Sequence, residues 1–267
     1  MRGFRVPGRY FELRQRSSIK KRPTICGPFC CRLEDRIGSC GTINALPVVM
    51  MEAFCHRPGE AMSFYDERVL PHLINCACSA KPNRKQREKI VPLAEGDVLE
   101  IGFGSGLNLP FYNTQIVRKI WGLEPSEGMR RKAQPMVDAS TLDVEFIDLP
   151  GESIPLEANS VDTVLVTYSL CTIPDAIAAL EGMRRVLKPG GSLLFCEHGI
   201  APDESVRRWQ HRLNPAWSRF AGGCNMNRDI LDLIRKGGFE ISSDERMYIP
   251  GVKILCYNYW GRAQAVP

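Results

Sequence analysis

The chain has 267 residues, of which 44% are hydrophobic and 24% are charged, and this composition is ordinary for a globular protein with a sizeable core. Its net charge of +5 is unevenly distributed: residues 1–61 contain 11 Lys or Arg against 5 Asp or Glu, and residues 62–267 contain 24 against 25. The larger part is nearly neutral, which argues against a nucleic-acid-binding domain. No apolar stretch reaches the roughly 20 residues that span a bilayer, and no signal-type apolar run follows the basic N-terminus.

Residues 1–61 show no sustained helical or strand period and contain Arg-rich runs and several Pro and Gly. We expect this basic, Cys-rich extension to be largely disordered. Met62 precedes the first well-patterned segment, and one hypothesis is that translation starts there and that the extension is not native. A second hypothesis is a basic arm that contacts anionic lipid. Residues 62–267 are expected to form one folded domain.

Cysteines are numerous, with 11 in the whole chain. Four cysteines of the extension are candidate zinc ligands. Their spacing fits no standard paired pattern, so no metal site is predicted. They are Cys26, Cys30, Cys31 and Cys40. The six cysteines after residue 61 sit mostly in apolar runs, which is typical of reduced, buried thiols in a cytoplasmic protein.

From Phe64 onward, helical and strand patterns alternate. Helices are expected over residues 64–77 (with the register interrupted by Pro71), 81–89, 107–112 (cut short by Pro110), 175–187 and 228–236, and after the N-cap Ser126. The charges of residues 81–89 predict a solvated face. Strands are expected over residues 98–101, 119–124, 144–147, 161–167, 192–196, 239–247 and 253–260. The alternation of strands and helices predicts an α/β fold with a doubly wound, mostly parallel sheet. The last two strands are joined by a turn rather than a helix, which predicts that the last strand is antiparallel.

A glycine loop (residues 102–106) follows the first strand, with Gly102, Gly104 and Gly106 at every second position. A dinucleotide fingerprint needs a third glycine where this chain has Leu107, and the loop lacks the lysine of a phosphate-binding loop. A loop without a basic group, flanked by carboxylates, suits a cationic ligand without phosphate. S-adenosylmethionine is such a ligand, and an NAD-dependent oxidoreductase is the weaker alternative.

Two carboxylates support this interpretation. Glu124 ends the second strand about twenty residues past the loop, where an acid can accept hydrogen bonds from both ribose hydroxyls. NAD would use the same acid, so Glu124 alone does not discriminate. Glu100 either contacts the cofactor's amino group or orients the loop.

Five segments together resemble the successive motifs of class I S-adenosylmethionine-dependent methyltransferases, in the methyltransferase type 11 group. They are residues 98–106, 122–126, 151–155, 160–164 and 186–191. The resemblance covers about residues 64–262 and implies a seven-stranded Rossmann-like sheet with S-adenosylmethionine at the carboxyl ends of the strands. It also implies that Gly151 and Glu152 lie beside the adenine, and that Thr167 and Tyr168 face the methionine part.

Finer features resemble the methyltransferase-like 7 thiol methyltransferases. They are residues 108–112, 170–171, 197–198 and 223–228. A small thiol is therefore the first expected methyl acceptor. A phospholipid amino headgroup, a quinone-type ring and a non-enzymatic S-adenosylmethionine-binding module remain alternatives. That family carries an apolar N-terminal membrane segment that this chain lacks, so membrane residence is not carried over.

The acceptor needs alignment and, for a thiol, a base or a positive charge. His198, at the end of the fifth strand, is the first catalytic candidate, and His211 is the second. Cys171 and Cys224 are expected near the mouth as wall residues. Residues 209–227, with three large aromatic side chains, are expected to form an apolar lid.

Overall fold

The computed structural model of the chain describes residues 69–266. The expected extension, with its four clustered cysteines and the start hypothesis at Met62, lies outside the described residues, and so does the helical pattern before Val69. No helix in the described range is long and apolar enough to cross a membrane.

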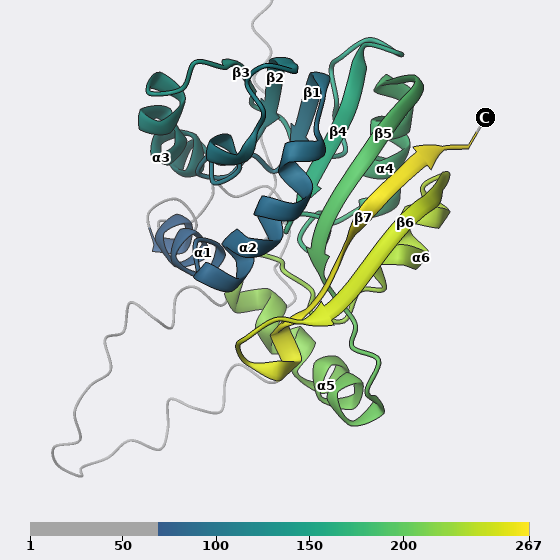
Figure 1. Cartoon of the computed structure of the whole chain (residues 1–267). Coiled ribbons are helices and arrows are strands. Elements are labelled where there is room, and N and C mark those ends of the chain that lie inside the picture. Colours follow the sequence, from purple (N-terminus) through teal and green to yellow (C-terminus); the bar gives the residue numbers. More distant parts are fainter. Residues whose placement is uncertain (1–68, 267) are drawn as a thin grey trace, which may run out of the picture. The chain divides into compact units, whose positions relative to one another are not determined.

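Seven strands form one sheet in the described part of the chain, with the spatial order β3-β2-β1-β4-β5-β7-β6 (Figure 1). The strands are β1 (Gly96–Ile101), β2 (Val117–Leu123), β3 (Asp143–Ile147), β4 (Val161–Thr167), β5 (Leu187–His198), β6 (Phe239–Tyr248) and β7 (Tyr257–Ala265). The first five pair in parallel, and β7 runs antiparallel to both β5 and β6. The predicted doubly wound sheet with an antiparallel last strand is confirmed.

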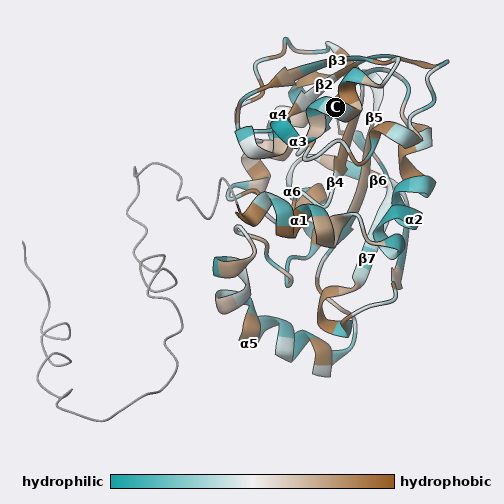
Figure 2. Ribbon diagram, turned by 90° about the vertical axis from the view of Figure 1, so that its left-hand side faces the viewer, coloured by the Kyte–Doolittle hydropathy of each residue, from teal (hydrophilic) through white to brown (hydrophobic). Residues whose placement is uncertain are grey.

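Helices cover both faces of this sheet (Figure 1). They are α1 (Leu70–Cys78), α2 (Lys81–Ile90), α3 (Glu127–Asp138), α4 (Ala176–Val186), α5 (Glu204–Phe220) and α6 (Ile230–Lys236), with short 3-10 turns at Val91–Leu93, Leu109–Phe111 and Lys253–Leu255. Successive strand residues face opposite sides, so the buried Leu193 packs toward α4 and α6 while Leu194 packs toward α2 and α3. Burial on both faces explains why β4 carries the consecutive apolar residues 164–166 (Figure 2).

Two helices begin directly after residues that cap their N-termini. Ser126 Oγ accepts a hydrogen bond from Met129 N at the start of α3, and the Asp175 carboxylate accepts one from Ala178 N at the start of α4. Both starts agree with the sequence.

Three local expectations need correction. Pro71 does not interrupt α1 but lies in its first turn, where its missing N–H costs nothing. The segment after the glycine loop forms a 3-10 turn rather than an α-helix, since Pro110 sits in it. The helix α2 is hydrophilic (Figure 2), yet its charges are not all solvated, because Arg87 is buried.

Phe103 anchors the glycine loop to the sheet. Its ring is buried, meets Phe146 edge-on with ring centroids 5.3 Å apart, and lies directly over Gly122 of β2. A Cβ atom at residue 122 would come within 2.6 Å of the ring, so only glycine leaves room for it. The loop's position therefore depends on a glycine in the neighbouring strand.

This contact predicts a coupled pair of substitutions. Gly122→Ala should lower the free energy of unfolding by about 1–3 kcal/mol, because the added methyl group overpacks the ring. In the Phe103→Leu background the same change should cost clearly less, and denaturant unfolding of the two single variants and the double variant measures this coupling. Strict additivity would show that the ring does not fill the space above residue 122.

Candidate functional site

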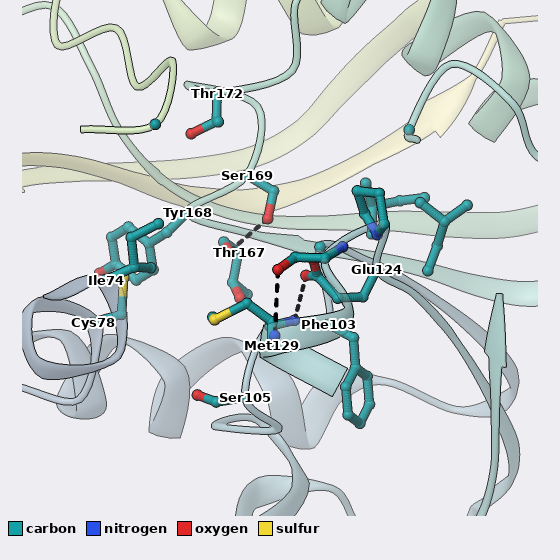
Figure 3. Close-up of a pocket in the computed structure, with 18 of the residues that line it drawn as sticks. Ile74, Cys78, Phe103, Ser105, Glu124, Met129, Thr167, Tyr168, Ser169 and Thr172 are labelled. Atoms are coloured by element: carbon teal, nitrogen blue, oxygen red, sulfur yellow. Dashed lines mark hydrogen bonds between the residues drawn. The ribbon is translucent and has the colours of Figure 1, made fainter. Parts of the chain in front are cut away.

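A cavity of about 330 Å³ opens where the carboxyl ends of β1, β2 and β4 meet (Figure 3). Its walls come from α1, α2, the glycine loop, the end of β2 and the loops after β3 and β4, with Gly222 closing one side. In α/β sheets, ligands bind where the strand order reverses, and β1 lies between β2 and β4 at such a point. Figure 3 shows Glu124 on one side of the cavity and Tyr168, Ile74 and Cys78 grouped on the other.

The glycines of the loop have different roles. Gly102 and Gly104 line the cavity in left-handed backbone conformations (φ +69° and +60°), which residues with a Cβ rarely adopt. A Cβ at Gly102 would also collide with the Ser169 hydroxyl at 2.1 Å. Gly106 does not line the cavity, and a Cβ there would press on Leu109 at 3.3 Å. Its backbone is left-handed as well (φ +79°), so glycine is required there by backbone conformation and by packing beneath the loop rather than by ligand approach.

Glu124 is nearly buried and lines the cavity directly after β2. One carboxylate oxygen accepts a hydrogen bond from Gly104 N at 2.9 Å, and the other accepts one from Ser126 N at 2.9 Å. Burial raises the pKa of this group, although the two backbone hydrogen bonds oppose the shift. Each oxygen keeps a second acceptor site, so the carboxylate can hold the loop and still accept two hydroxyl donors from a ligand.

Glu100 lies behind the cavity wall rather than in it. Its oxygens accept hydrogen bonds from Asn108 Nδ2 at 2.8 Å and from the Tyr112 hydroxyl at 2.6 Å, all inside the core. Burial raises its pKa to about 7, while both hydrogen bonds oppose the shift. Of its two predicted roles, the geometry fits loop orientation: Glu100 fixes Asn108, which lines the cavity.

Thr167 and Tyr168 line the cavity at the end of β4. Thr167 Oγ1 accepts from Asn108 Nδ2 at 3.0 Å, which ties β4 to the glycine loop. Tyr168 has a left-handed backbone (φ +54°), a conformation that is uncommon outside glycine and concentrated at functional sites. Its hydroxyl donates to Asn258 Oδ1 at 2.7 Å, so the ring is fixed in the wall.

Gly151 and Glu152 line the far end, together with Pro125, Pro150 and Ile173. A Cβ at Gly151 would meet Ile173 at 2.8 Å, so glycine keeps this slot open. Glu152 accepts a hydrogen bond from Asp175 N at 3.1 Å. The slot is narrow and largely apolar, as a flat aromatic base requires.

The first two helices supply a wall that the sequence did not indicate. Arg87 of α2 is 5% exposed; its guanidinium donates to Cys78 O at 2.7 Å and lies over the Tyr168 ring at 5.0 Å. Arg87 Nε and Asn108 Oδ1 are buried without a hydrogen-bond partner among the described residues. Both residues line the cavity, and a guanidinium and a side-chain amide suit a ligand that has both a carboxylate and an amino group.

The two histidines lie elsewhere. His198 does not line the cavity; it stacks against Tyr168 with ring centroids 6.5 Å apart, and its Nε2 is 3.2 Å from Cys224 Sγ. His211 is on the exposed side of α5, 3.0 Å from Asn227 Nδ2, and is not brought to the cavity. Of the expected lid, only Gly222 lines the cavity, and Trp209 and Phe220 are exposed.

Comparisons with known proteins agree with this geometry. Residues 99–195 match the family model described as "Methyltransferase domain". Thiol S-methyltransferase TMT1B of Homo sapiens is 31% identical over 195 residues, which cover 67% of this chain and 79% of that protein. The Rattus norvegicus TMT1B is 34% identical over 149 residues, which cover 54% of this chain and only 60% of that protein's length.

Solved structures give the same fold. A Thermotoga maritima structure, described as an S-adenosylmethionine-dependent methyltransferase and possible histamine N-methyltransferase, superposes with a TM-score of 0.54 at 23% identity. The superposition covers 74% of this chain and 96% of the other. At this level of identity it supports the fold alone.

The buried Glu100 predicts a pH effect on stability. The folded state keeps its proton up to about pH 7, whereas the unfolded group loses it near the usual value of 4.5, so the free energy of unfolding should fall as pH rises through this window. Glu197 acts in the same direction for the same reason. Glu100→Gln should therefore reduce the fall by on the order of 1 kcal/mol or more, measured by denaturant unfolding without ligand. Glu95→Gln, at an exposed position, is the control; equal slopes in both variants would contradict the assignment.

Proposed function

Since the chain belongs to the class I S-adenosylmethionine-dependent methyltransferases, we propose that its cavity binds S-adenosylmethionine and that the acceptor of the methyl group is a small thiol. The observation that carries the cofactor assignment is the position of Glu124, which lines the cavity directly after β2 and accepts a hydrogen bond from Gly104 N of the glycine loop.

Each part of the cofactor has a chemically matched partner. Glu124 would accept hydrogen bonds from the ribose hydroxyls, and the slot at Gly151 and Glu152 would take the adenine. Arg87 would bind the methionine carboxylate, and Asn108 Oδ1 would accept from the amino group. Gly102 and Gly104 let the backbone approach closely, whereas Gly106 and Glu100 would act indirectly by shaping the loop.

When bound, S-adenosylmethionine supplies a methyl group already activated by its sulfonium. The chain's own task is then to align the acceptor and to exclude water, and good alignment can supply roughly 7–11 kcal/mol of the barrier. Thr167 and Tyr168 would border the methionine part of the site. Leu70 and Ile74 of α1 give the acceptor side an apolar wall.

The thiol acceptor is supported by the names of the human and rat relatives and by the apolar wall. The free pKa of a thiol is about 8.5, so a nearby base or cation would raise the fraction of reactive thiolate. His198 remains the proposed group for this role, and since it does not line the cavity it would act next to the wall residue Tyr168, on which it stacks. The exposed position of His211 gives that second candidate little support.

A cytoplasmic location also remains a prediction.

The ribose assignment is tested by a matched pair of variants. Glu124→Ala should weaken S-adenosylhomocysteine binding by about 10–100-fold in calorimetry, because charge-assisted hydrogen bonds of about 1.5–3 kcal/mol are lost. Glu127→Ala removes a carboxylate three residues away that is 71% exposed, and it should leave the affinity unchanged. Equal affinities of both variants would contradict the assignment, provided that circular dichroism shows both folded.

The acceptor is tested with labelled S-adenosylmethionine against three chemical classes. Alkyl thiols and hydrogen sulfide should accept the label far faster than phosphatidylethanolamine or a quinone precursor. Faster labelling of the phospholipid or the quinone would replace the thiol by that class. Cofactor binding without turnover on any acceptor would favour a non-enzymatic binding module.

A further inference from the structure

Three side chains with metal-binding atoms meet beside the cavity wall. Cys171 follows β4, His198 ends β5, and Cys224 lies in the loop after α5, so three distant segments converge. His198 Nε2 is 3.2 Å from Cys224 Sγ, and Cys224 Sγ is 3.8 Å from Cys171 Sγ. All three ligand atoms lie within 4.8 Å of one another. None of the three residues lines the cofactor cavity.

These separations match those of a tetrahedral zinc site. With Zn–S bonds of about 2.3 Å and Zn–N bonds of about 2.0 Å, neighbouring donor atoms on a tetrahedron lie roughly 3.5–3.8 Å apart. Cys171 and Cys224 already have this spacing, and His198 Nε2 lies 3.2 Å from Cys224 Sγ and within 4.8 Å of Cys171 Sγ. A site with two cysteines and one histidine also binds zinc in preference to magnesium or calcium.

The backbone holds two of these side chains in place without an ion. Cys171 O accepts hydrogen bonds from Asn225 N at 2.8 Å and Asn225 Nδ2 at 3.2 Å, which fixes the loop of Cys224 against the loop of Cys171. Asn225 Oδ1 in turn accepts from Asn214 Nδ2 at 2.9 Å. His198 Nδ1 is buried and has no hydrogen-bond partner in the described range, so the ring is oriented by its stacking on Tyr168 and not by a hydrogen bond on that side.

The cluster lies next to the acceptor side of the cavity. Thr172 lines the cavity, and its hydroxyl is 3.5 Å from Cys171 Sγ. Tyr168 lines the cavity and stacks on His198. Three protein ligands leave one of the four tetrahedral positions open, as in catalytic zinc sites.

We propose that Cys171, His198 and Cys224 bind a zinc ion whose open position takes the sulfur of the acceptor thiol. The second half rests on the proposed thiol acceptor. On binding, the thiol would release its proton to solvent, because metal-coordinated thiols are deprotonated. The thiolate electron pair would then form the new carbon–sulfur bond. The bond from the methyl carbon to the sulfonium would break, and its electrons would remain on that sulfur, which becomes a neutral thioether.

Metal content tests the site without any reference to activity. The full chain is equilibrated with zinc, freed of unbound metal and analysed by mass spectrometry. Cys171→Ser and Cys224→Ser should each lose about one zinc per chain relative to the wild type. Cys76→Ser, at an exposed cysteine of α1, should keep the wild-type content, which controls for the other cysteines of the chain. Zinc content unaffected by Cys171→Ser and Cys224→Ser would overturn the site.

Cobalt substitution tests the site on the wild-type chain itself, so the test does not depend on the folding of a variant. Cobalt bound to the wild-type chain should show thiolate charge-transfer absorption, and this band should be absent or weaker in folded Cys224→Ser. The Cys224→Ser variant should still bind S-adenosylhomocysteine with wild-type affinity, because Cys224 lies outside the cavity. A wild-type chain without this band, or with a disulfide between Cys171 and Cys224 after purification in reductant, would overturn the proposal.

Activity then separates the two claims. Cys224→Ser should lower thiol methylation by at least 10–100-fold. Thiol methylation that persists in a zinc-free chain would refute the zinc role and leave the proposed function intact. Zinc that is bound at the cluster of a chain inactive on thiols would refute the thiol acceptor and the role of the open position, but not the metal site.

Discussion

The site depends on buried carboxylates that must find hydrogen-bond donors in the loops around the cavity. Glu100, Glu124 and Glu197 lie at or next to the carboxyl ends of β1, β2 and β5, and each accepts two hydrogen bonds from a neighbouring loop. A buried charge without such partners is costly, so the donors are held where the carboxylates need them. These hydrogen bonds hold the loops that follow β1, β2 and β4 around one cavity.

The same arrangement gives the cavity its electrostatic character. Glu124 lines it, Glu100 lies just behind it, and Arg87 is the buried cation that faces them from α2. A ligand with a cationic sulfonium, an amino group and a carboxylate matches this pattern better than one with phosphates, for which the glycine loop offers no basic side chain. The cysteine and histidine cluster lies next to this cavity, in contact with its lining residues Tyr168 and Thr172.

Sequence patterns predict the sheet and several residues that line the cavity, because period and capping are local properties. The acidic residue Glu124 directly after β2 and the N-cap at Ser126 can both be predicted in this way. The contribution of Arg87 cannot be predicted in this way. A strongly charged helix is expected to be solvated, and only tertiary contacts bury one of its side chains. The distinction between Gly104 and Gly106, and the meeting of Cys171, His198 and Cys224, depend on packing between segments far apart in the chain.

The most direct test of the account is a crystal structure of the full chain with S-adenosylhomocysteine. The account predicts the ribose hydroxyls on Glu124, the adenine in the slot at Gly151, and the carboxylate on Arg87. Adenosine bound with its ribose away from Glu124, or a ligand held outside this cavity, would contradict the central claim.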